Sequence, residues 1–311
     1  MAVAWPFGAD GQQPRQPVIG FLAAAPPAIT VEHLAGIRQG LAEAGYVDGQ
    51  NLSIEHRTAE GVYNRLPGLA ADLVARRIDV IIAQSPPAAH AAKAATGTIP
   101  IVFGVGIDPV AEGLVTSLAR PGGNLTGVTL LSSDLMAKRL ALICEMVPQA
   151  RLIALLLNPS SPNPWISGVE EVARAKGVRL LILKAATPAE IETAFTAMAQ
   201  QQVQALVIGE DTFLAQREQI ADFALRSKIP SIGILRRFAE SGGLVSYGTN
   251  LKDAYRQIGV YAGQILKGAK PADLPVQQPI KFEMTINLKT AKALGIEIAP
   301  LLLARADEVI E

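Results

Sequence analysis

The sequence predicts an α/β protein with two doubly wound, Rossmann-like parallel-sheet lobes, joined by a multi-strand hinge with a ligand cleft between them. Three observations predict it. Short β-branched apolar runs alternate with helix-period stretches from residue 18 onward, as in βαβ units. The strand runs are almost continuously apolar, which is typical of parallel strands covered by helices on both faces. The same order of elements then occurs a second time along the chain.

The expected strands are short and the expected helices have one apolar face. The strands cover residues 18–22, 51–57, 79–83, 101–104, 127–130, 152–158, 179–184, 205–209, 231–235, 244–247 and 282–286. The helices between them include residues 31–44, 65–76, 134–146, 165–175, 188–201, 213–227 and 255–267. This alternation favours parallel sheets with helical crossovers.

The internal repeat indicates two similar halves. The strand at 18–22, a helix ending at Gly45 and the strand at 51–57 match the strand at 152–158, a helix ending at Gly177 and the strand at 179–184. DVIIA at 79–83 matches ALVIG at 205–209, and IPIVF at 99–103 matches IPSIG at 229–233. The sequence thus contains two copies of one wound unit.

The last fifth of the chain predicts how the lobes are joined. The helix at 255–267 comes too late to belong to the second half alone, and a Pro-rich connector at 267–275 and one more strand–helix pair follow it. We expect residues 17–128 plus about 249–279 in one lobe, residues 129–248 plus about 280–311 in the other, and a tail at 1–16. Repeated crossing makes a hinge, and clefts between lobes commonly bind small ligands.

Composition excludes several classes of protein. The chain has 311 residues, 50% of them hydrophobic, enough for two domains of roughly 100–200 residues. Its 28 basic and 28 acidic residues cancel, so charge does not point to nucleic acid. One cysteine, Cys144, excludes an internal disulfide, and three scattered histidines form no paired zinc motif. We expect no metal and no cofactor.

The N-terminal residues and the longest apolar runs bear on location. Residues 1–16 are apolar and then polar, without a basic start, and predict a floppy tail or the shortened end of an export signal. No other run approaches the ~18 apolar residues of a membrane span.

Candidate ligand-binding residues follow the predicted strands. In open parallel sheets, ligands lie at the carboxyl ends of strands, where helix N-termini present N–H groups. In the first half these residues are Ala24, Ala25, Ser85, Pro86, Gly104 and Asp108. In the second half they are Asn158, Pro159, Asp211, Thr212, Arg236, Tyr247 and Gly248.

Two of these positions predict helix starts. Ser85 is a favoured N-cap residue and Pro86 suits the first helical position. A helix beginning there could hold a ligand carboxylate on its amides, with a dipole contribution of about 0.3–1 kcal/mol. Simple capping without a ligand explains the same residues. The pair Asn158–Pro159 has the same two interpretations.

Other candidates also have structural alternatives. Asp211 could accept from a ligand ammonium group or cap the helix at 213–227, and Asp108 could simply form a turn with Pro109. Tyr247 could stack on a ligand ring or belong to the core. Trp165 and Tyr63 could line the cleft, although packing on the sheet is the commoner place for Trp165. Cys144 lies on a helical apolar stripe and is expected to be inert core.

Common catalytic motifs are absent from the sequence. There is no GxxxxGK[ST] phosphate loop, no GxSxG elbow, and no GxGxxG after the first strand, where Ala23–Ala25 stands instead. We therefore expect a binding protein and not an enzyme. An enzyme of the same fold class remains an alternative. A second alternative is the effector-sensing module of a regulator, although residues 1–17 are too short for a DNA-binding headpiece.

Four stretches carry a family resemblance. They are GLAEAGYVDGQNLSIEHR at 40–57, IPIVFGVGIDPVAEGLVTSLARPGGNLTGVT at 99–129, GGLVSYGTNL at 242–251 and INLKTAKALGIEIAPLLLARADEVIE at 286–311. With them, residues from about 17 to 311 resemble the ABC-transporter substrate-binding proteins of the TrpX-like group, which have the type I periplasmic-binding-protein fold. Residues 2–13 also look like the end of that group's export signal.

The resemblance implies a function. It implies a monomeric periplasmic receptor that captures a small molecule by clamshell closure and delivers it to a membrane permease, with no nucleic-acid partner. Because members of the group favour aromatic amino acids, it implies an aromatic amino acid or related aromatic carboxylate as ligand. The sequence departs from the group's commoner Ser/Gly-rich loop after the first strand, since Ala23, Ala24 and Ala25 stand there. This departure predicts a more apolar pocket wall on that side.

Overall fold

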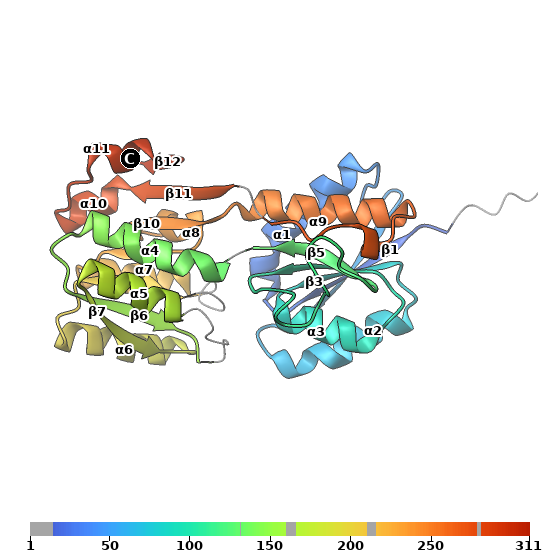
Figure 1. Ribbon diagram of the computed structural model, residues 1–311, viewed down its shortest axis with the longest axis horizontal. Coiled ribbons are helices and arrows are strands. Elements are labelled where there is room, and N and C mark those ends of the chain that lie inside the picture. The colour runs from blue at the N-terminus through green and yellow to red at the C-terminus, as the bar shows by residue number, and fades with distance from the viewer. Residues whose placement is uncertain (1–14, 131, 160–165, 210–215, 279–280) are drawn as a thin grey trace, which may run out of the picture.

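The chain forms two α/β lobes that lie side by side along its long axis (Figure 1). The computed structural model describes residues 15–130, 132–159, 166–209, 216–278 and 281–311. Each lobe contains one sheet between layers of helices. The sheet of the first lobe has the strand order β2-β1-β3-β4-β5, and that of the second lobe has the order β12-β11-β10-β9-β8-β6-β7.

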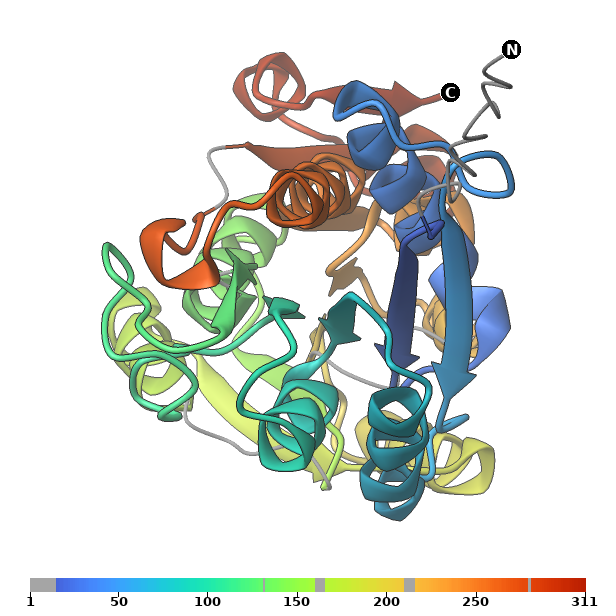
Figure 2. The ribbon, with the colours of Figure 1, turned by 90° about the vertical axis from the view of Figure 1, so that its right-hand side faces the viewer.

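The first lobe is a parallel sheet covered on both faces. Its strands are β1 (Val18–Ala23), β2 (Ser53–Thr58), β3 (Val80–Gln84), β4 (Ile101–Val105) and β5 (Leu125–Thr129), all paired in parallel. One face packs on α1 (Pro27–Glu43) and α9 (Leu251–Leu266). The other packs on α2 (Leu66–Ala75) and α3 (Pro86–Ala95). Figure 2 shows α9 on the opposite side of the sheet from α2 and α3.

Helices α1 and α9 approach each other closely because glycines lie at their contact. A Cβ atom on Gly40 would lie 1.9 Å from the carbonyl oxygen of Arg256, and one on Gly259 would lie 2.1 Å from that of Ile37. Only a residue without a side chain fits at such backbone contacts. These glycines therefore fix α9, which follows a strand of the second lobe, onto the first lobe.

The second lobe repeats the arrangement of the first. Its strands are β6 (Leu152–Leu157), β7 (Arg179–Lys184), β8 (Ala205–Ile208), β9 (Ser231–Gly233), β10 (Val245–Thr249), β11 (Phe282–Asn287) and β12 (Glu308–Ile310). Helices α4 (Ser132–Met146) and α5 (Ile166–Lys176) cover one face, and α6 (Pro188–Gln200), α7 (Arg217–Arg226) and α8 (Arg236–Glu240) cover the other. Helices α10 (Leu288–Leu294) and α11 (Pro300–Ala304) follow β11.

Strand order confirms the predicted repeat. The order β2-β1-β3-β4-β5 of the first lobe corresponds to β7-β6-β8-β9-β10 of the second. The helices of the two repeated units end as expected, since Gly45 and Gly177 have φ angles of 87° and 66°. These left-handed conformations favour glycine after a helix.

Both predicted parallel sheets are present, and one strand of the second departs from the parallel direction. β11 pairs antiparallel with β10, although β12 then pairs in parallel with β11. The chain enters β11 from the first lobe and β10 leaves toward that lobe, so the two strands run in opposite directions. The short elements α8, α11 and β12 were not predicted, and the described part of α7 begins at Arg217. Residue 213, where that helix was expected to begin, lies outside the described residues.

Three segments of the chain cross between the lobes and contact one another. The chain crosses after β5, after β10, and before β11, as Figure 1 shows. The Thr249 hydroxyl donates to the carbonyl oxygen of Leu130 at 2.6 Å, and the N–H of Thr129 donates to the carbonyl oxygen of Gln277 at 2.9 Å. These bonds join the crossings into one hinge, as the sequence predicts.

Candidate ligand-binding site

The carboxyl ends of the parallel strands of both lobes face the hinge. The chain leaves the first lobe from the carboxyl end of β5, and β1 to β4 run parallel with β5. It leaves the second lobe from the carboxyl end of β10, and β6 to β9 run parallel with β10. The two sets of strand ends therefore meet at the junction of the lobes, where ligands of such sheets bind.

Small side chains dominate the strand ends of the first lobe. Ala23, Gln84 and Gly104 form one row across β1, β3 and β4. Ala24 is buried and Ala25 is half-buried. A Cβ atom on Gly104 would lie 2.8 Å from Cδ1 of Ile258, so α9 packs directly against this position. The wall is mostly apolar, and Gln84 is the polar member of the row.

Ser85 and Pro86 begin α3, as expected. The Ser85 hydroxyl oxygen accepts from the N–H of Ala88 at 3.4 Å, and the N–H of Ala89 donates to the Ser85 carbonyl oxygen at 3.0 Å. Pro86 and Pro87 carry no N–H. The first turn of α3 therefore has few free N–H groups that could bind a ligand carboxylate. The Ser85 hydroxyl still has its own proton to donate.

The backbone of Ser85 is strained. Its φ and ψ angles are 99° and 155°, in a region occupied almost only by glycine that costs about 1–3 kcal/mol. The N–H of Ser85 donates to the carbonyl oxygen of Gly104 at 3.0 Å, which holds the residue in this conformation against β4. Such strain concentrates at binding sites.

Asp108 lies in its own turn. Its Oδ1 atom accepts from the N–H groups of Val110 at 2.8 Å and Ala111 at 3.3 Å. The side chain is exposed. These hydrogen bonds are the ones expected if the Asp108 side chain simply stabilises its own turn.

Candidate residues of the second lobe differ in burial. Asn158 follows β6 and is 3% exposed, while Pro159 is exposed. Gly248 lies in β10, where a Cβ atom would meet the carbonyl oxygen of Ile234 at 2.1 Å. Asp211, Thr212 and Trp165 lie outside the described residues.

Tyr247 packs inside the second lobe. It is 8% exposed, its ring stacks near Phe282 with centroids 6.2 Å apart, and Nζ of Lys138 lies 5.0 Å from its centroid. The backbone of Tyr247 is held by Arg139, a fully buried α4 side chain whose Nε donates to the Tyr247 carbonyl oxygen at 2.7 Å. These contacts fix β10 against α4 next to the hinge.

Two adjacent arginines of α8 have different partners. Arg236 pairs with Glu240 at 3.3 Å and hydrogen-bonds Glu308 at 2.7 Å, which raises the pKa of its guanidinium. Both partners belong to the second lobe. Arg237 instead forms an ion pair with Glu32 on α1 of the first lobe. Both arginines follow the same strand in the sequence, where only Arg236 was chosen as a candidate, and it is Arg237 whose ion pair connects the two lobes.

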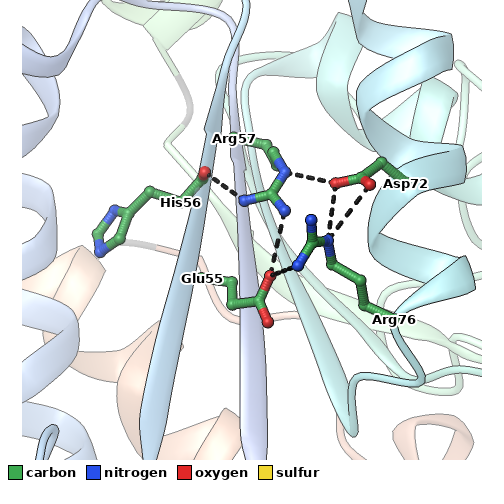
Figure 3. Close-up of polar contacts among 5 residues, drawn as sticks. All are labelled: Glu55, His56, Arg57, Asp72 and Arg76. Atoms are coloured by element: carbon green, nitrogen blue, oxygen red, sulfur yellow. Dashed lines mark hydrogen bonds and ion pairs between the residues drawn. The ribbon is translucent and has the colours of Figure 1, made fainter.

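A network of four charged side chains lies on an edge of the first lobe (Figure 3). Arg57 of β2 pairs with Asp72 at 2.6 Å and with Glu55 at 3.1 Å, and Arg76 pairs with the same two carboxylates. The hydrogen bond from Arg57 holds the pKa of Asp72 below its usual range. Two cations and two anions thus satisfy one another and tie α2 to β2, so this network has a structural role.

A small apolar pocket lies at the strand ends of the second lobe. It is lined by Ile208, Gly209, Arg217, Ile220, Gly233, Ile234, Leu235 and Phe238, at the carboxyl ends of β8 and β9. No three His, Cys, Asp or Glu side chains among the described residues gather into a group that could hold a metal ion. In the same part of the chain, none of the helices is long and apolar enough to cross a membrane.

Two parallel-sheet lobes that share a hinge and meet at their strand ends define a two-lobed binding protein of the type I periplasmic-binding-protein fold. The sequence profile of the ABC transporter substrate-binding proteins matches residues 27–310. The chain belongs to this family, and it is a substrate-binding protein of an ABC transporter. A regulator module or an enzyme of the same fold class is not favoured.

Known relatives agree with this assignment. A curated tyrosine-binding protein of Clostridioides difficile (strain R20291) is 30% identical over 266 residues, which cover 84% of this chain and 76% of the relative. The crystal structure of an ABC domain from Streptococcus pneumoniae in complex with L-Trp has 29% identity and a TM-score of 0.84, and covers 95% of this chain and 100% of that chain.

A third relative was solved in an open conformation without ligand. It is the ligand-free, open form of a Clostridium difficile substrate-binding protein with adhesive properties, at 26% identity and a TM-score of 0.69, covering 94% of this chain and 99% of that chain. Identity and coverage differ little from those of the L-Trp complex. This chain therefore superposes better on the L-Trp complex than on this ligand-free, open structure.

Proposed function

We propose that this protein captures an aromatic amino acid, or a related aromatic carboxylate, between its lobes and delivers it to an ABC permease. The observation that carries the proposal is the similarity, over most of the chain, to one relative that is named for binding tyrosine and another solved with L-Trp. The mostly apolar strand ends of the first lobe suit a ligand with a ring.

Closure between the lobes is the proposed mechanism. A ligand that contacts strand ends of both lobes binds the closed form better than the open form, and this difference shifts the population toward closure. Proposed contacts are the residues at the strand ends, namely Ala24, Ala25, Ser85, Pro86, Gly104, Asp108, Asn158, Pro159, Asp211, Thr212, Arg236, Tyr247 and Gly248. A micromolar dissociation constant corresponds to about −8 kcal/mol.

The proposal includes the organisation and location of the chain. Residues 17–128 plus about 249–279 form one domain, and residues 129–248 plus about 280–311 form the other. Members of the family act outside the cytoplasm, so we place this protein in the periplasm, as a monomer that carries out no reaction on its ligand and docks on the permease when closed.

Ligand screening tests the proposal. Thermal unfolding is measured with each of the common amino acids and with aromatic carboxylates, and positive results are followed by isothermal titration calorimetry. A ligand at ~100 times its dissociation constant stabilises the folded protein by about 2.7 kcal/mol. We expect L-tryptophan, L-tyrosine or L-phenylalanine to give the largest shift. A larger shift with an aliphatic or charged amino acid, or chemical conversion of the bound ligand, would contradict the proposal.

A further inference from the structure

Asn250 is the residue at which the second crossing between the lobes turns. β10 of the second lobe ends at Thr249 and α9 begins at Leu251, so a single residue separates the two elements. The last pair of the β10–β11 ladder joins Thr249 to Phe282, and Asn250 is the first residue beyond it. A rotation of one lobe relative to the other therefore changes the backbone angles at or next to Asn250.

The elements on either side of Asn250 are each fixed to one lobe. α9 packs closely on α1, because Gly40 and Gly259 leave no room for a side chain between the helices. β11 pairs with β10 and, on its other side, with β12. Figure 1 shows α9 on the first lobe and β11 in the second. When the lobes rotate, α9 therefore moves with the first lobe and β11 with the second.

The Asn250 side chain is bonded to both of these elements. Its Oδ1 atom accepts from the N–H of Asp253 at 2.8 Å and so caps the N-terminus of α9. Its Nδ2 atom donates to Oε1 of Glu283 on β11. The backbone N–H of Asn250 also donates to the carbonyl oxygen of Lys281 at 3.3 Å. One amide side chain thus connects a helix of the first lobe to a strand of the second, at the point where the chain turns.

The surroundings of Glu283 make the hydrogen bond from Asn250 important for its charge. Burial and the carboxylate of Asp307 raise the pKa of Glu283, and the hydrogen bond from Asn250 opposes that rise. Glu308 adds a further negative charge, while Arg236, which favours the charged form of Glu283, is hydrogen-bonded to Glu308. A lobe arrangement that separates Asn250 from Glu283 therefore removes a bond that compensates the burial of this carboxylate.

We propose that the side chains of Asn250 and Glu283 form a hinge clasp, which favours the present arrangement of the lobes over arrangements in which they are rotated. Both are positioning residues, since the clasp acts without contact to a ligand. The inference goes beyond the proposed function and does not depend on which ligand binds. Under the proposed function, the population of the binding-competent arrangement also sets the apparent affinity for the ligand.

The test exchanges the amide and the carboxylate of the clasp. Asn250→Asp keeps a good N-cap for α9 but places a carboxylate against Glu283. Glu283→Gln removes the charge of the acceptor. The double variant Asn250→Asp with Glu283→Gln again has one amide donor and one carboxylate acceptor, with their positions exchanged.

The matched control is Asn287→Asp. Asn287 is the N-cap residue of α10, where its Oδ1 atom accepts from the N–H of Thr290 at 3.0 Å. Its Nδ2 atom donates to the carbonyl oxygen of Ala239 at 2.8 Å. The same substitution therefore breaks a similar bond, but one that lies wholly within the second lobe.

The readout is the distance between the lobes in the ligand-free protein, measured by pulsed electron paramagnetic resonance. Spin labels are attached through Gln264→Cys on α9 and Thr193→Cys on α6, two exposed positions in different lobes. Cys144→Ser removes the cysteine that the chain already contains. All variants of the clasp are compared in this background.

We expect Asn250→Asp to lower the population at the wild-type distance, relative to all other distances, by about threefold to tenfold. Glu283→Gln should cause a smaller change, because its amide oxygen still accepts a hydrogen bond. The double variant should return to within about twofold of the wild-type ratio. Asn287→Asp should lower the free energy of unfolding without changing the distance between the lobes.

If Asn250→Asp does not fold, judged by circular dichroism, Asn250→Ser replaces it. Serine keeps a cap for α9 and removes the donor to Glu283, so the shift in population should have the same direction.

Three results overturn the proposal. They are the same distance distribution in the wild type and the Asn250 variant, a double variant no closer to the wild type than Asn250→Asp, and an equal shift in Asn287→Asp. The last would indicate a general effect of lost stability. A ligand screen without any aromatic ligand would overturn the proposed function but not the hinge clasp, because the distances are measured without ligand.

Discussion

The ion pair between Glu32 and Arg237 should control how readily the lobes close. Glu32 lies on α1 of the first lobe and Arg237 on α8 of the second. α1 follows the carboxyl end of β1 and α8 follows that of β9, so the pair spans the junction of the lobes. If the lobes separate, the pair breaks. It therefore stabilises the closed form only, and a change in its energy alters the apparent affinity for ligand.

The solvent exposure of the two side chains determines how much free energy the ion pair contributes. The side chains of Arg237 and Glu32 are 47% and 57% exposed, and such surface pairs contribute about 0.2–1 kcal/mol. Reversing one charge removes this attraction and adds a repulsion of similar size. Glu32→Arg or Arg237→Glu should therefore weaken ligand binding by about 0.4–2 kcal/mol, which is about 2- to 30-fold in Kd.

A double-mutant cycle on Kd measures this coupling. The exchange Glu32→Arg with Arg237→Glu should restore most of the affinity, and all differences should shrink at ~1 M salt, where the screening length falls to ~3 Å. Glu145→Arg is the matched control, because Glu145 pairs with Arg305 at 3.0 Å within the second lobe. An exchange variant no tighter than the single variants, or a control that shifts Kd equally, would refute the reasoning.

Three further predictions concern stability and the site. Gly40→Ala should lower the free energy of unfolding by at least ~2 kcal/mol, since its Cβ would lie 1.9 Å from the carbonyl oxygen of Arg256, whereas Gly68→Ala, with open space around it, should not; urea denaturation compares them. Burial lowers the pKa of His33 from 6.5 to about 4, so the unfolded chain binds the extra proton, and up to about 3 kcal/mol of stability is lost as pH falls from 6.5 toward 4. His33→Phe should reduce this loss of folding stability between pH 6.5 and 4. An unchanged loss would contradict its assignment to His33. Ser85→Gly should leave stability unchanged or raise it, because relief of φ 99° outweighs a cap loss of a few tenths of a kcal/mol, yet weaken ligand binding; destabilisation by more than ~1 kcal/mol would argue against strain.

Much of the fold follows from local pattern. The Ser85–Pro86 pair predicted the start of α3, and the structure has Ser85 as its N-cap. Apolar runs predicted the buried strands, and the glycines at 45 and 177 predicted helix ends. These features depend on residues close together in the sequence, whose preferences act whatever the rest of the chain does.

The direction of β11 and the partners of the α8 arginines did not follow from local pattern. β11 runs antiparallel to β10 because the chain returns to it from the other lobe. Arg236 and Arg237 are neighbours in the sequence, but the turn of α8 directs one toward Glu308 and the other toward Glu32. No local signal distinguishes the two, since their partners lie far away along the chain.

The sequence by itself determined the class of protein: two wound α/β units, a chain that crosses between them repeatedly, and strand ends where a ligand can bind. Only the tertiary structure decided which polar groups at those ends are already satisfied. The first amides of α3 and the Asp108 carboxylate have partners in their own turns, while Gln84 Oε1 has none among the described residues. The reason is physical: a hydrogen bond depends on the positions of both groups, and Gln84 meets Tyr255 only when α9 returns to the first lobe.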